Sequence, residues 1–199
     1  MSQQQSVDAD VGWRCEIELP TPEEWVPLDL DADDPRSWAD QLVSEHVPRA
    51  VAERREALVA ELLEFRDIAL GKDAALACVR LAGPTGPVAA FLHVVPVPDP
   101  SLTGPESVAE IWRQERPYVL RRPEISTVQL PAGPAGRLRE VSHNGEGADD
   151  LIEYVTHAIF SPELPGMLEV TLTWNSLAFG EEYSVLADQI ARSLRVVTA

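Results

Sequence analysis

The sequence predicts an α+β fold with a mainly antiparallel sheet and helices packed on it. The expected elements follow the order strand, helices, a run of strands, helix, which is typical of that class. The links between successive strands are short and rich in Pro and Gly, which favours hairpins over crossovers. With 199 residues, of which 45% are hydrophobic and 25% charged, the chain can bury a core without disulfides or a metal.

The N-terminal part is expected to begin with a tail. Residues 1–11 are polar and predict a disordered segment, with a single α+β domain over residues 12–199. Trp13–Leu19 alternates between apolar and charged residues, which is the period of a half-buried strand. A second short extended piece is expected over Trp25–Leu30.

Two helices are expected next. Asp33-Asp34-Pro35 has an acidic cap followed by Pro, which is typical of a first helical turn. Pro48 breaks or restarts this helix, because proline cannot donate the backbone hydrogen bond of a helix interior. Apolar residues at helical spacing predict a second helix from Arg49 to about Leu70, which Gly71 ends.

The remainder reads as hairpins and two helices. Ala74–Ala82 and Val88–Val97 are apolar runs joined by a Gly/Pro turn, and a short amphipathic helix is expected over Pro105–Glu115. The last helix is expected over about Gly180–Leu194, with acidic residues at its start and arginines near its end. Four further strands are expected between these helices, at Glu124–Leu130, Gly136–Ser142, Leu151–Phe160 and Leu168–Trp174.

The charge excludes two classes of partner. The formal net charge is −17, which would repel the phosphates of nucleic acid and an anionic membrane surface. The first residues lack the basic and apolar regions of a signal peptide, and no apolar run reaches the length of about 18 residues of a membrane span. We therefore expect a cytoplasmic protein that is a monomer or a homodimer.

The cysteines and histidines give weak signals for a metal or redox site. Cys15 and Cys78 form no CxxC motif and lie in apolar stretches, which favours buried free thiols and leaves a disulfide open. The histidines allow a cross-sheet zinc cluster, but no HxH, HxxxH or HExxH motif fixes two ligands. We expect ordinary strand or loop histidines and no cofactor; the four are His46, His93, His143 and His157.

Three further motifs fit poorly to known sites. Residues 29–34 resemble the start of a calcium loop, but Asp34 and Asp40 occupy the positions that need Gly and Glu, so helix capping explains the acids better. Residues 143–150 contain GxG without the third Gly of a dinucleotide site, which indicates a hairpin loop. Glu153 and Glu169 could meet on neighbouring strands as an acid/base pair, although exposed strand carboxylates are commoner.

The tryptophans leave two interpretations open. Each lies on an expected apolar face, which favours anchoring of the core, whereas exposed members would mark a surface for a partner. The five are Trp13, Trp25, Trp38, Trp112 and Trp174.

Two stretches carry a family resemblance. Trp-Val-Pro-Leu at Trp25–Leu28 precedes an Asp-Pro-x-x-Trp helix start at Asp34–Trp38. Leu168–Trp174 leads through residues 175–180 into a helix that ends in Ala191–Arg195. With the order of elements over residues 13–197, these stretches resemble the PsbP/Mog1-like α/β/α sandwich family, including uncharacterised actinobacterial proteins of that type. The resemblance implies a binding or assembly role and carries over no catalytic residue.

Two functions follow as alternatives. The first is a non-enzymatic accessory domain that binds or assembles with a protein partner, because the core-forming pattern is complete and no catalytic constellation stands out. The second is a small enzyme or small-ligand-binding domain, with a site formed on the sheet by scattered residues such as His93, His157 and Glu153. A pocket lined by these residues would favour the second function.

Overall fold

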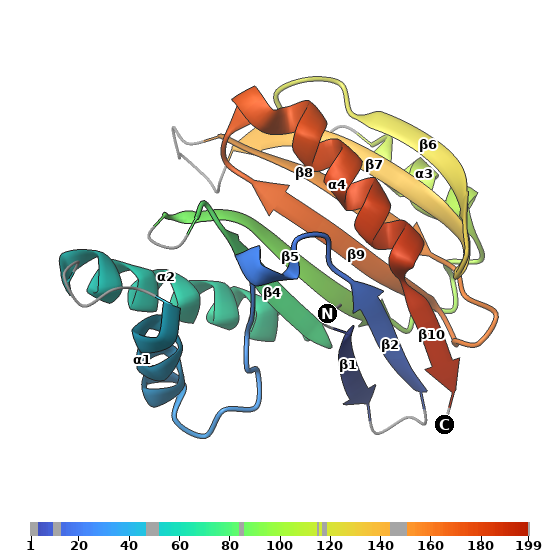
Figure 1. Cartoon of the computed structure of the whole chain (residues 1–199). Helices are drawn as coiled ribbons and strands as arrows, with labels where there is room; N and C mark the ends of the chain where they lie inside the picture. Colours follow the sequence, from blue (N-terminus) through green and yellow to red (C-terminus); the bar gives the residue numbers. More distant parts are fainter. Residues whose placement is uncertain are drawn as a thin grey trace.

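The computed structural model describes residues 4–9, 13–46, 52–83, 86–114, 116, 119–143 and 151–198 (Figure 1). Within these residues the chain has the expected α+β fold, built on a seven-stranded sheet in which all neighbours are antiparallel. Its strands are β3 Trp25–Pro27, β4 Leu76–Leu81, β5 Val88–Val97, β6 Glu124–Leu130, β7 Gly133–His143, β8 Leu151–Ile159 and β9 Met167–Trp174. Their order across this large sheet is β3-β4-β5-β9-β8-β7-β6.

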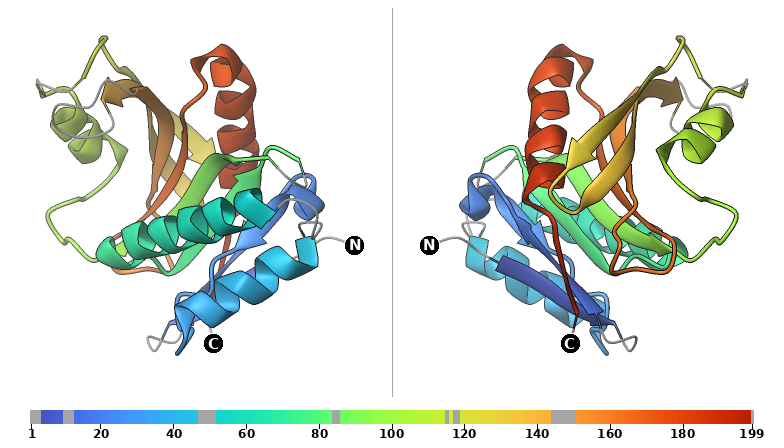
Figure 2. Two further views of the ribbon diagram at one scale, coloured as in Figure 1. Left: turned by 90° about the vertical axis from the view of Figure 1, so that its left-hand side faces the viewer. Right: turned by 90° about the vertical axis from the view of Figure 1, so that its right-hand side faces the viewer.

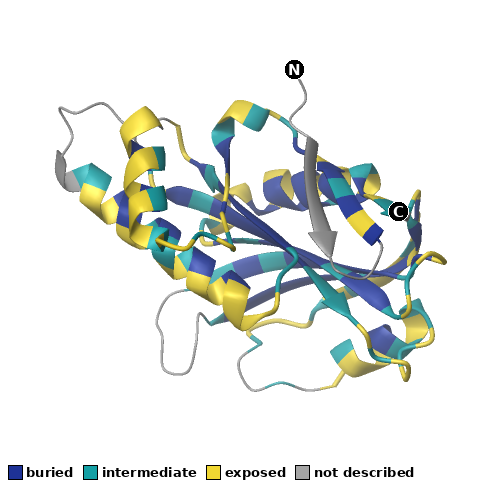
Figure 3. Cartoon of the chain, turned by 90° about the horizontal axis from the view of Figure 1, so that it is seen from below, coloured by how far each residue is buried: buried dark blue, intermediate teal, exposed yellow. Residues whose placement is uncertain are grey.

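Helices cover both faces of the large sheet. The helical segments are η1 Pro22–Glu24, α1 Pro35–His46, α2 Ala52–Gly71, α3 Pro105–Trp112, η2 Leu177–Phe179 and α4 Gly180–Ser193. Figure 2 shows α2 and α3 on one side of the sheet and α4 on the other, with α1 outside α2. Buried residues follow the strands and the inner helix faces, and exposed residues lie on the outer helix faces (Figure 3).

The face under α4 carries the largest core cluster. A three-stranded sheet in the described residues packs beside α4, in the order β1-β2-β10, from β1 Gln4–Ala9, β2 Trp13–Glu18 and β10 Arg195–Thr198. Every second residue of β9 faces this core, including Leu172 and Trp174, and meets Leu186 and Ile190 of α4 and Ile17 of β2. The alternation along β9 thus sorts its apolar residues to α4 and its polar residues to the opposite face.

The α2 side forms a second core cluster. Leu58 and Leu62 of α2 pack with Val79 and Phe91 of the sheet. Buried Arg66 donates hydrogen bonds of 2.8 Å to the carbonyl oxygens of Asp29 and Leu30, which ties the connection before α1 to α2.

Local sequence signals explain the start of α1. The Asp34 carboxylate accepts hydrogen bonds from the backbone N–H and the hydroxyl of Ser37, at 3.0 and 2.7 Å, and Pro35 is the first helical residue. The acidic cluster at residues 29–34 therefore caps a helix, as expected from the sequence.

Two elements differ from the sequence-based expectation. Residues 4–9, expected in a disordered tail, form β1, which pairs antiparallel with β2 over Gln4–Ala9. After buried Leu194 the chain leaves α4 in an extended conformation and forms β10 on the other side of β2, where no strand was expected. Both segments are strands because they form backbone hydrogen bonds with β2, and the side-chain patterns of such short segments do not indicate this pairing.

The cysteines are both free and buried in the core cluster under α4. Burial raises the pKa of the Cys15 thiol to about 11 and raises the pKa of the Cys78 thiol further, so both stay protonated at neutral pH.

Candidate functional site

A groove lies on the sheet between α2 and α3. It has a volume of about 540 Å³, and its floor comes from β5, β9 and β8. The groove exists because α2 packs on β4 and β5 while α3 packs on β6, β7 and β8, so neither helix covers the middle of the face (Figure 2). The polar residues of β9, Thr171 and Thr173, line this uncovered strip.

One row across the floor joins three polar side chains. His93 on β5 is paired with Thr171 on β9, and Thr171 is paired with Thr156 on β8. The hydroxyl oxygens of Thr156 and Thr171 lie 2.9 Å apart in a hydrogen bond. All three residues are buried and line the groove.

The neighbouring row runs from an aromatic ring to a buried carboxylate. Phe91, Thr173 and Tyr154 are paired in succession across β5, β9 and β8. The Tyr154 hydroxyl donates a hydrogen bond to the carboxylate of Glu140 on β7, and the Arg116 guanidinium donates to the same carboxylate. Glu140 is fully buried, and this network fixes Tyr154 and Arg116 at the α3 end of the groove.

Aromatic side chains form the two walls. On the α2 side, the rings of Phe65 and Phe91 have centroids 5.0 Å apart, and Phe91 stacks on His93 at 5.0 Å with 28° between the planes. On the α3 side, Trp112 lies over Gly136 of β7, where an added Cβ would sit 3.0 Å from the indole ring. The absent side chain at Gly136 thus lets the indole approach the sheet and close this side of the groove.

His93 is the most unusual residue of the groove. It is 3% exposed, and within the described part of the chain neither ring nitrogen has a hydrogen-bond partner. Burial lowers the pKa of His93 to about 3, and the charge of Lys72 adds to the effect. The ring is therefore neutral at physiological pH and offers one N–H donor and one lone-pair acceptor to a molecule in the groove.

The charged residues around the groove balance. Its lining holds two acids, Glu64 and Glu169, and two bases, Lys72 and Arg116. The formal charges of the groove lining therefore sum to zero, although the whole chain carries a formal charge of −17.

The structure separates the three residues that the sequence groups into one site. His93 pairs with Thr171 and faces the groove, whereas His157 pairs with Val170 and faces α4. Glu153 also lies on the α4 face. The predicted grouping of His93, His157 and Glu153 is therefore wrong, because residues of the same sheet at odd and even register positions project to opposite faces.

His157 instead belongs to a buried network under α4. Its Nε2 is 3.0 Å from Oδ1 of Asp188, which also accepts a 2.7 Å hydrogen bond from Arg137. Burial raises the pKa of Asp188, but the hydrogen bonds from His157 and Arg137 outweigh it and lower the pKa to about 2. Arg137 also donates a hydrogen bond of 2.7 Å to the Ser184 hydroxyl, so the network links the sheet to α4.

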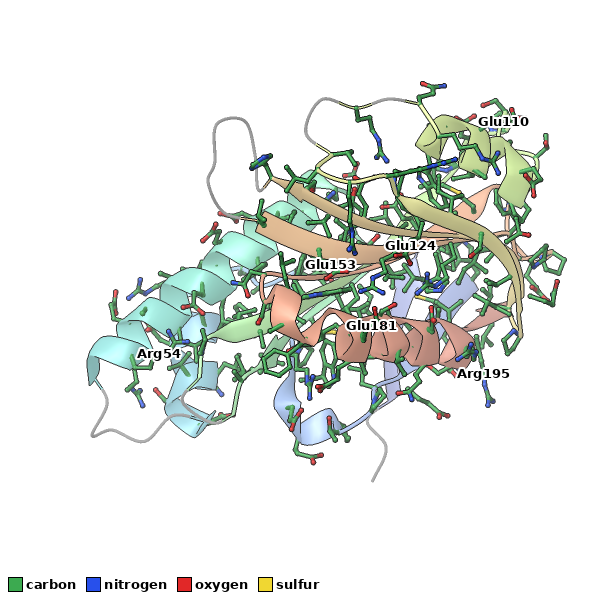
Figure 4. The ribbon with its side chains drawn as sticks, turned by 90° about the horizontal axis from the view of Figure 1, so that it is seen from above. Arg54, Glu110, Glu124, Glu153, Glu181 and Arg195 are labelled. Carbon is green, nitrogen blue, oxygen red and sulfur yellow. The ribbon has the colours of Figure 1, made fainter. Side chains whose placement is uncertain are left out.

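Glu153 belongs to a second hydrogen-bonded network that links the sheet to the start of α4. Arg139 donates hydrogen bonds of 2.7 Å to both Glu153 and Glu181, and Arg121 reaches Glu153 at 3.4 Å. Figure 4 labels Glu153 and Glu181. A Cβ added at Gly180 would lie 2.4 Å from Oε2 of Glu153, so the carboxylate packs directly against the first turn of the helix. A negative charge is favourable there because it faces the positive end of the helix dipole.

The remaining sequence candidates do not form sites. Glu153 and Glu169 lie on opposite faces, since Glu169 lines the groove, so they make no acid/base pair. The GxG stretch at residues 144–150 and the side chain of His46 lie outside the described residues. In the described ranges no group of three or more His, Cys, Asp or Glu side chains is placed to hold a metal ion.

Sequence reasoning missed the groove itself. Thr171 and Thr173 alternate with apolar residues along β9, and this pattern does not show which strands the helices cover and which they leave open. Tyr154 and Thr156 carried no motif. One signal for the groove was available in the sequence, namely the short link between α2 and β4. A short link keeps α2 close to β4 and its neighbour β5, so α2 does not cover β9.

Comparisons with known proteins give a likeness of fold. No family model matches the chain, and no curated protein matches it. Among solved structures, the chain is similar to the solution structure of cyanobacterial PsbP (CyanoP) from Synechocystis sp. PCC 6803, at 12% sequence identity and a TM-score of 0.48. The match covers 99% of this chain and 94% of that chain. In the described residues, no helix combines the length and apolar character needed to cross a membrane.

Proposed function

We propose that this protein is a non-enzymatic binding domain that holds a small, uncharged, planar organic molecule in the groove between α2 and α3. The observation that carries the proposal is His93, a buried imidazole that lines the groove and whose two nitrogens have no hydrogen-bond partner among the described residues. A buried polar group without a hydrogen bond destabilises a protein by about 1–3 kcal/mol, and such groups often mark a functional site.

The size and chemistry of the groove support this choice of ligand. A volume of about 540 Å³ lies within the range of small-molecule pockets. Phe91 and Trp112 provide flat apolar walls, and the hydroxyls of Thr171 and Thr173 provide hydrogen bonds along the floor. The balanced charge of the lining favours a neutral ring over an ion.

The same residues support binding over catalysis. With its pKa at about 3, His93 is a weak base at neutral pH and would remove a proton inefficiently. The Thr171 hydroxyl lies 2.9 Å from the Thr156 hydroxyl and 3.3 Å from the Glu169 carboxylate, so it is held in a hydrogen-bond network on the groove floor.

The test is a titration of the full chain with p-cresol and with indole, followed by ¹H–¹⁵N NMR. We expect saturable shifts for amides of β5, β8 and β9, and at least tenfold weaker binding in His93→Phe and Thr171→Val. Thr127→Val makes the same chemical change on the exposed part of β6 and should leave binding unchanged. Equal affinities in folded Thr171→Val and Thr127→Val, or no saturable shift with either probe, would contradict the proposal.

The accessory role with a protein partner stays a prediction from the sequence. Trp13, Trp25 and Trp174 are buried, and Trp38 and Trp112 are half-buried, so the tryptophans act as core and groove residues. The ligand-binding alternative is therefore the one that the site favours.

A further inference from the structure

A chain of hydrogen bonds on the groove floor ends at a carboxylate. The Thr171 hydroxyl donates to Oε1 of Glu169 at 3.3 Å, and the hydroxyl oxygens of Thr171 and Thr156 lie 2.9 Å apart. Thr156 and Thr171 are buried, Glu169 is half-buried, and all three residues line the groove. The floor thus holds two buried hydroxyls whose hydrogen bonds run to one charged group.

The Glu169 carboxylate sets the direction of this chain. A hydroxyl has one proton and two lone pairs, whereas a carboxylate only accepts. A hydrogen bond to a charged acceptor is about twice as strong as one to a neutral acceptor, so the Thr171 proton points to Glu169 although that contact is the longer one. Thr156 must then donate to Thr171. Both protons are therefore used within the chain, and the two hydroxyls have only lone pairs left for a molecule in the groove.

His93 supplies the complementary half of the site. It is paired with Thr171 across β5 and β9, and the Cβ atoms of directly opposite residues in an antiparallel pair lie about 4.5–5.5 Å apart. One ligand atom can therefore contact both side chains. Within the described residues neither ring nitrogen of His93 has a hydrogen-bond partner, and the neutral ring carries one N–H. The position between His93 and Thr171 thus suits an atom that accepts one hydrogen bond and donates another.

We infer that the polar group of the ligand is a hydroxyl on its planar ring, which donates to Thr171 and accepts from His93, so that the ligand is a phenol. This inference rests on the proposed function, because it specifies the same uncharged molecule. A ketone, nitrile or ether has no proton for Thr171, and a ring N–H has no lone pair for His93. Glu169 is a positioning residue in this site, because it holds the Thr171 proton away from the ligand.

The test compares three neutral probes that share a toluene ring, by ¹H–¹⁵N NMR titration of the full chain at pH 7.5. The probe p-cresol donates and accepts, p-tolunitrile only accepts, and p-toluidine donates but is a poor acceptor. We expect p-cresol to bind at least tenfold more tightly than p-tolunitrile, and more tightly than p-toluidine, because each of the other probes leaves one buried polar group without a partner.

Matched variants test the role of Glu169. Glu169→Met removes the acceptor of the Thr171 proton, which is then able to turn to the ligand, so the preference for p-cresol over p-tolunitrile should fall to about threefold or less. The control Glu64→Met removes the same charge from the exposed α2 side of the groove and should keep the full preference. A loss of packing alone would weaken both probes equally and leave their ratio unchanged.

The outcomes separate the inference from the proposed function. If p-cresol binds but p-tolunitrile or p-toluidine binds equally well, the ligand is not selected as a phenol, so the inference is wrong and the proposed function stands. A preference that survives in Glu169→Met, or that falls as far in Glu64→Met, would also overturn the inference. Failure of all three probes to bind would refute both.

Discussion

Replacing His93 with Phe is expected to stabilise the protein while it removes binding. The imidazole is 3% exposed and both nitrogens lack partners among the described residues, so each one lost its hydration on folding without compensation. Phenylalanine keeps an aromatic ring beside Phe91 and removes both polar atoms. At pH 7.5 we expect a gain of about 1–3 kcal/mol in the free energy of unfolding. Such a trade between stability and function is common at binding sites.

The same substitution also predicts a change in pH dependence. The pKa of His93 is about 3 in the folded protein, against an ordinary value of 6.5, so the unfolded chain binds a proton that the folded protein does not. The wild type therefore loses stability as pH falls below 6.5, and the loss continues until the pH reaches about 3. Between pH 7.5 and pH 5 the loss due to His93 is about 2 kcal/mol, from 1.36 kcal/mol per pH unit. His93→Phe lacks this loss.

Urea unfolding followed by tryptophan fluorescence, at pH values from 7.5 to 5, measures both effects. Other groups that titrate in this range cancel in the difference between wild type and variant. The difference should widen by about 2 kcal/mol toward pH 5. His93→Leu should show the same widening with a different offset, since it changes the packing but removes the same titrating group. A difference that stays constant with pH in both variants would refute the description of His93 as a buried neutral imidazole.

Three further substitutions test the fold around the site. Leu172→Ala should lower the free energy of unfolding by about 2–5 kcal/mol in chemical denaturation, because Leu172 is 1% exposed in the core under α4; an unchanged midpoint would show that the face assignment is wrong. Asp188→Asn should lower the free energy of unfolding by roughly 1–2 kcal/mol at pH 7. The pKa of Asp188 is about 2 in the folded protein, below the ordinary value of 3.8, so its stabilisation is present above pH 3.8 and is lost as the pH falls toward 2. A variant that unfolds in acid with the same curve as the wild type would contradict the role of Asp188 in linking the sheet to α4. Gly180→Ala should destabilise the protein by about 1–3 kcal/mol, although alanine has the better helix propensity, because the new methyl group meets the Glu153 carboxylate. The control Gly71→Ala adds a methyl group in open space and should be neutral or stabilising. Equal melting temperatures for the two variants would contradict the packing of Glu153 against Gly180.

Much of the fold could be predicted from the sequence because its signals are local. Three such signals are the cap at Asp34, the turn after β4 and the apolar periodicity of α4, and each depends on residues that are close in the sequence. The structure contains the helix or hairpin that each signal predicts. The segment β10 could not be predicted, because it depends on pairing with β2, which is distant from Arg195 in the sequence. The segment β1 pairs with the adjacent β2, but its polar sequence lacks the apolar alternation that indicates a strand.

The site could be predicted only in part, for a related reason. His93 was identified as a candidate, but β5 is a nearly continuous apolar run, so its sequence does not show which face each residue takes. Placing His157 on the opposite face requires the register across β9, which is a long-range property. The position of the groove depends in turn on where α2 and α3 leave the sheet uncovered, which no local pattern records.

The central claim is that the His93 imidazole binds a ligand in the groove, and its own ring nitrogens report on this most directly. The measurement is long-range ¹H–¹⁵N NMR of the imidazole in the full chain at pH 7, during a titration with p-cresol. We predict a neutral ring at the start and a saturable shift of at least one ring nitrogen as p-cresol binds, with the ring nitrogens of His157 unchanged. Ring nitrogens of His93 that do not respond to saturating p-cresol, or that respond no more than those of His157, would contradict the account.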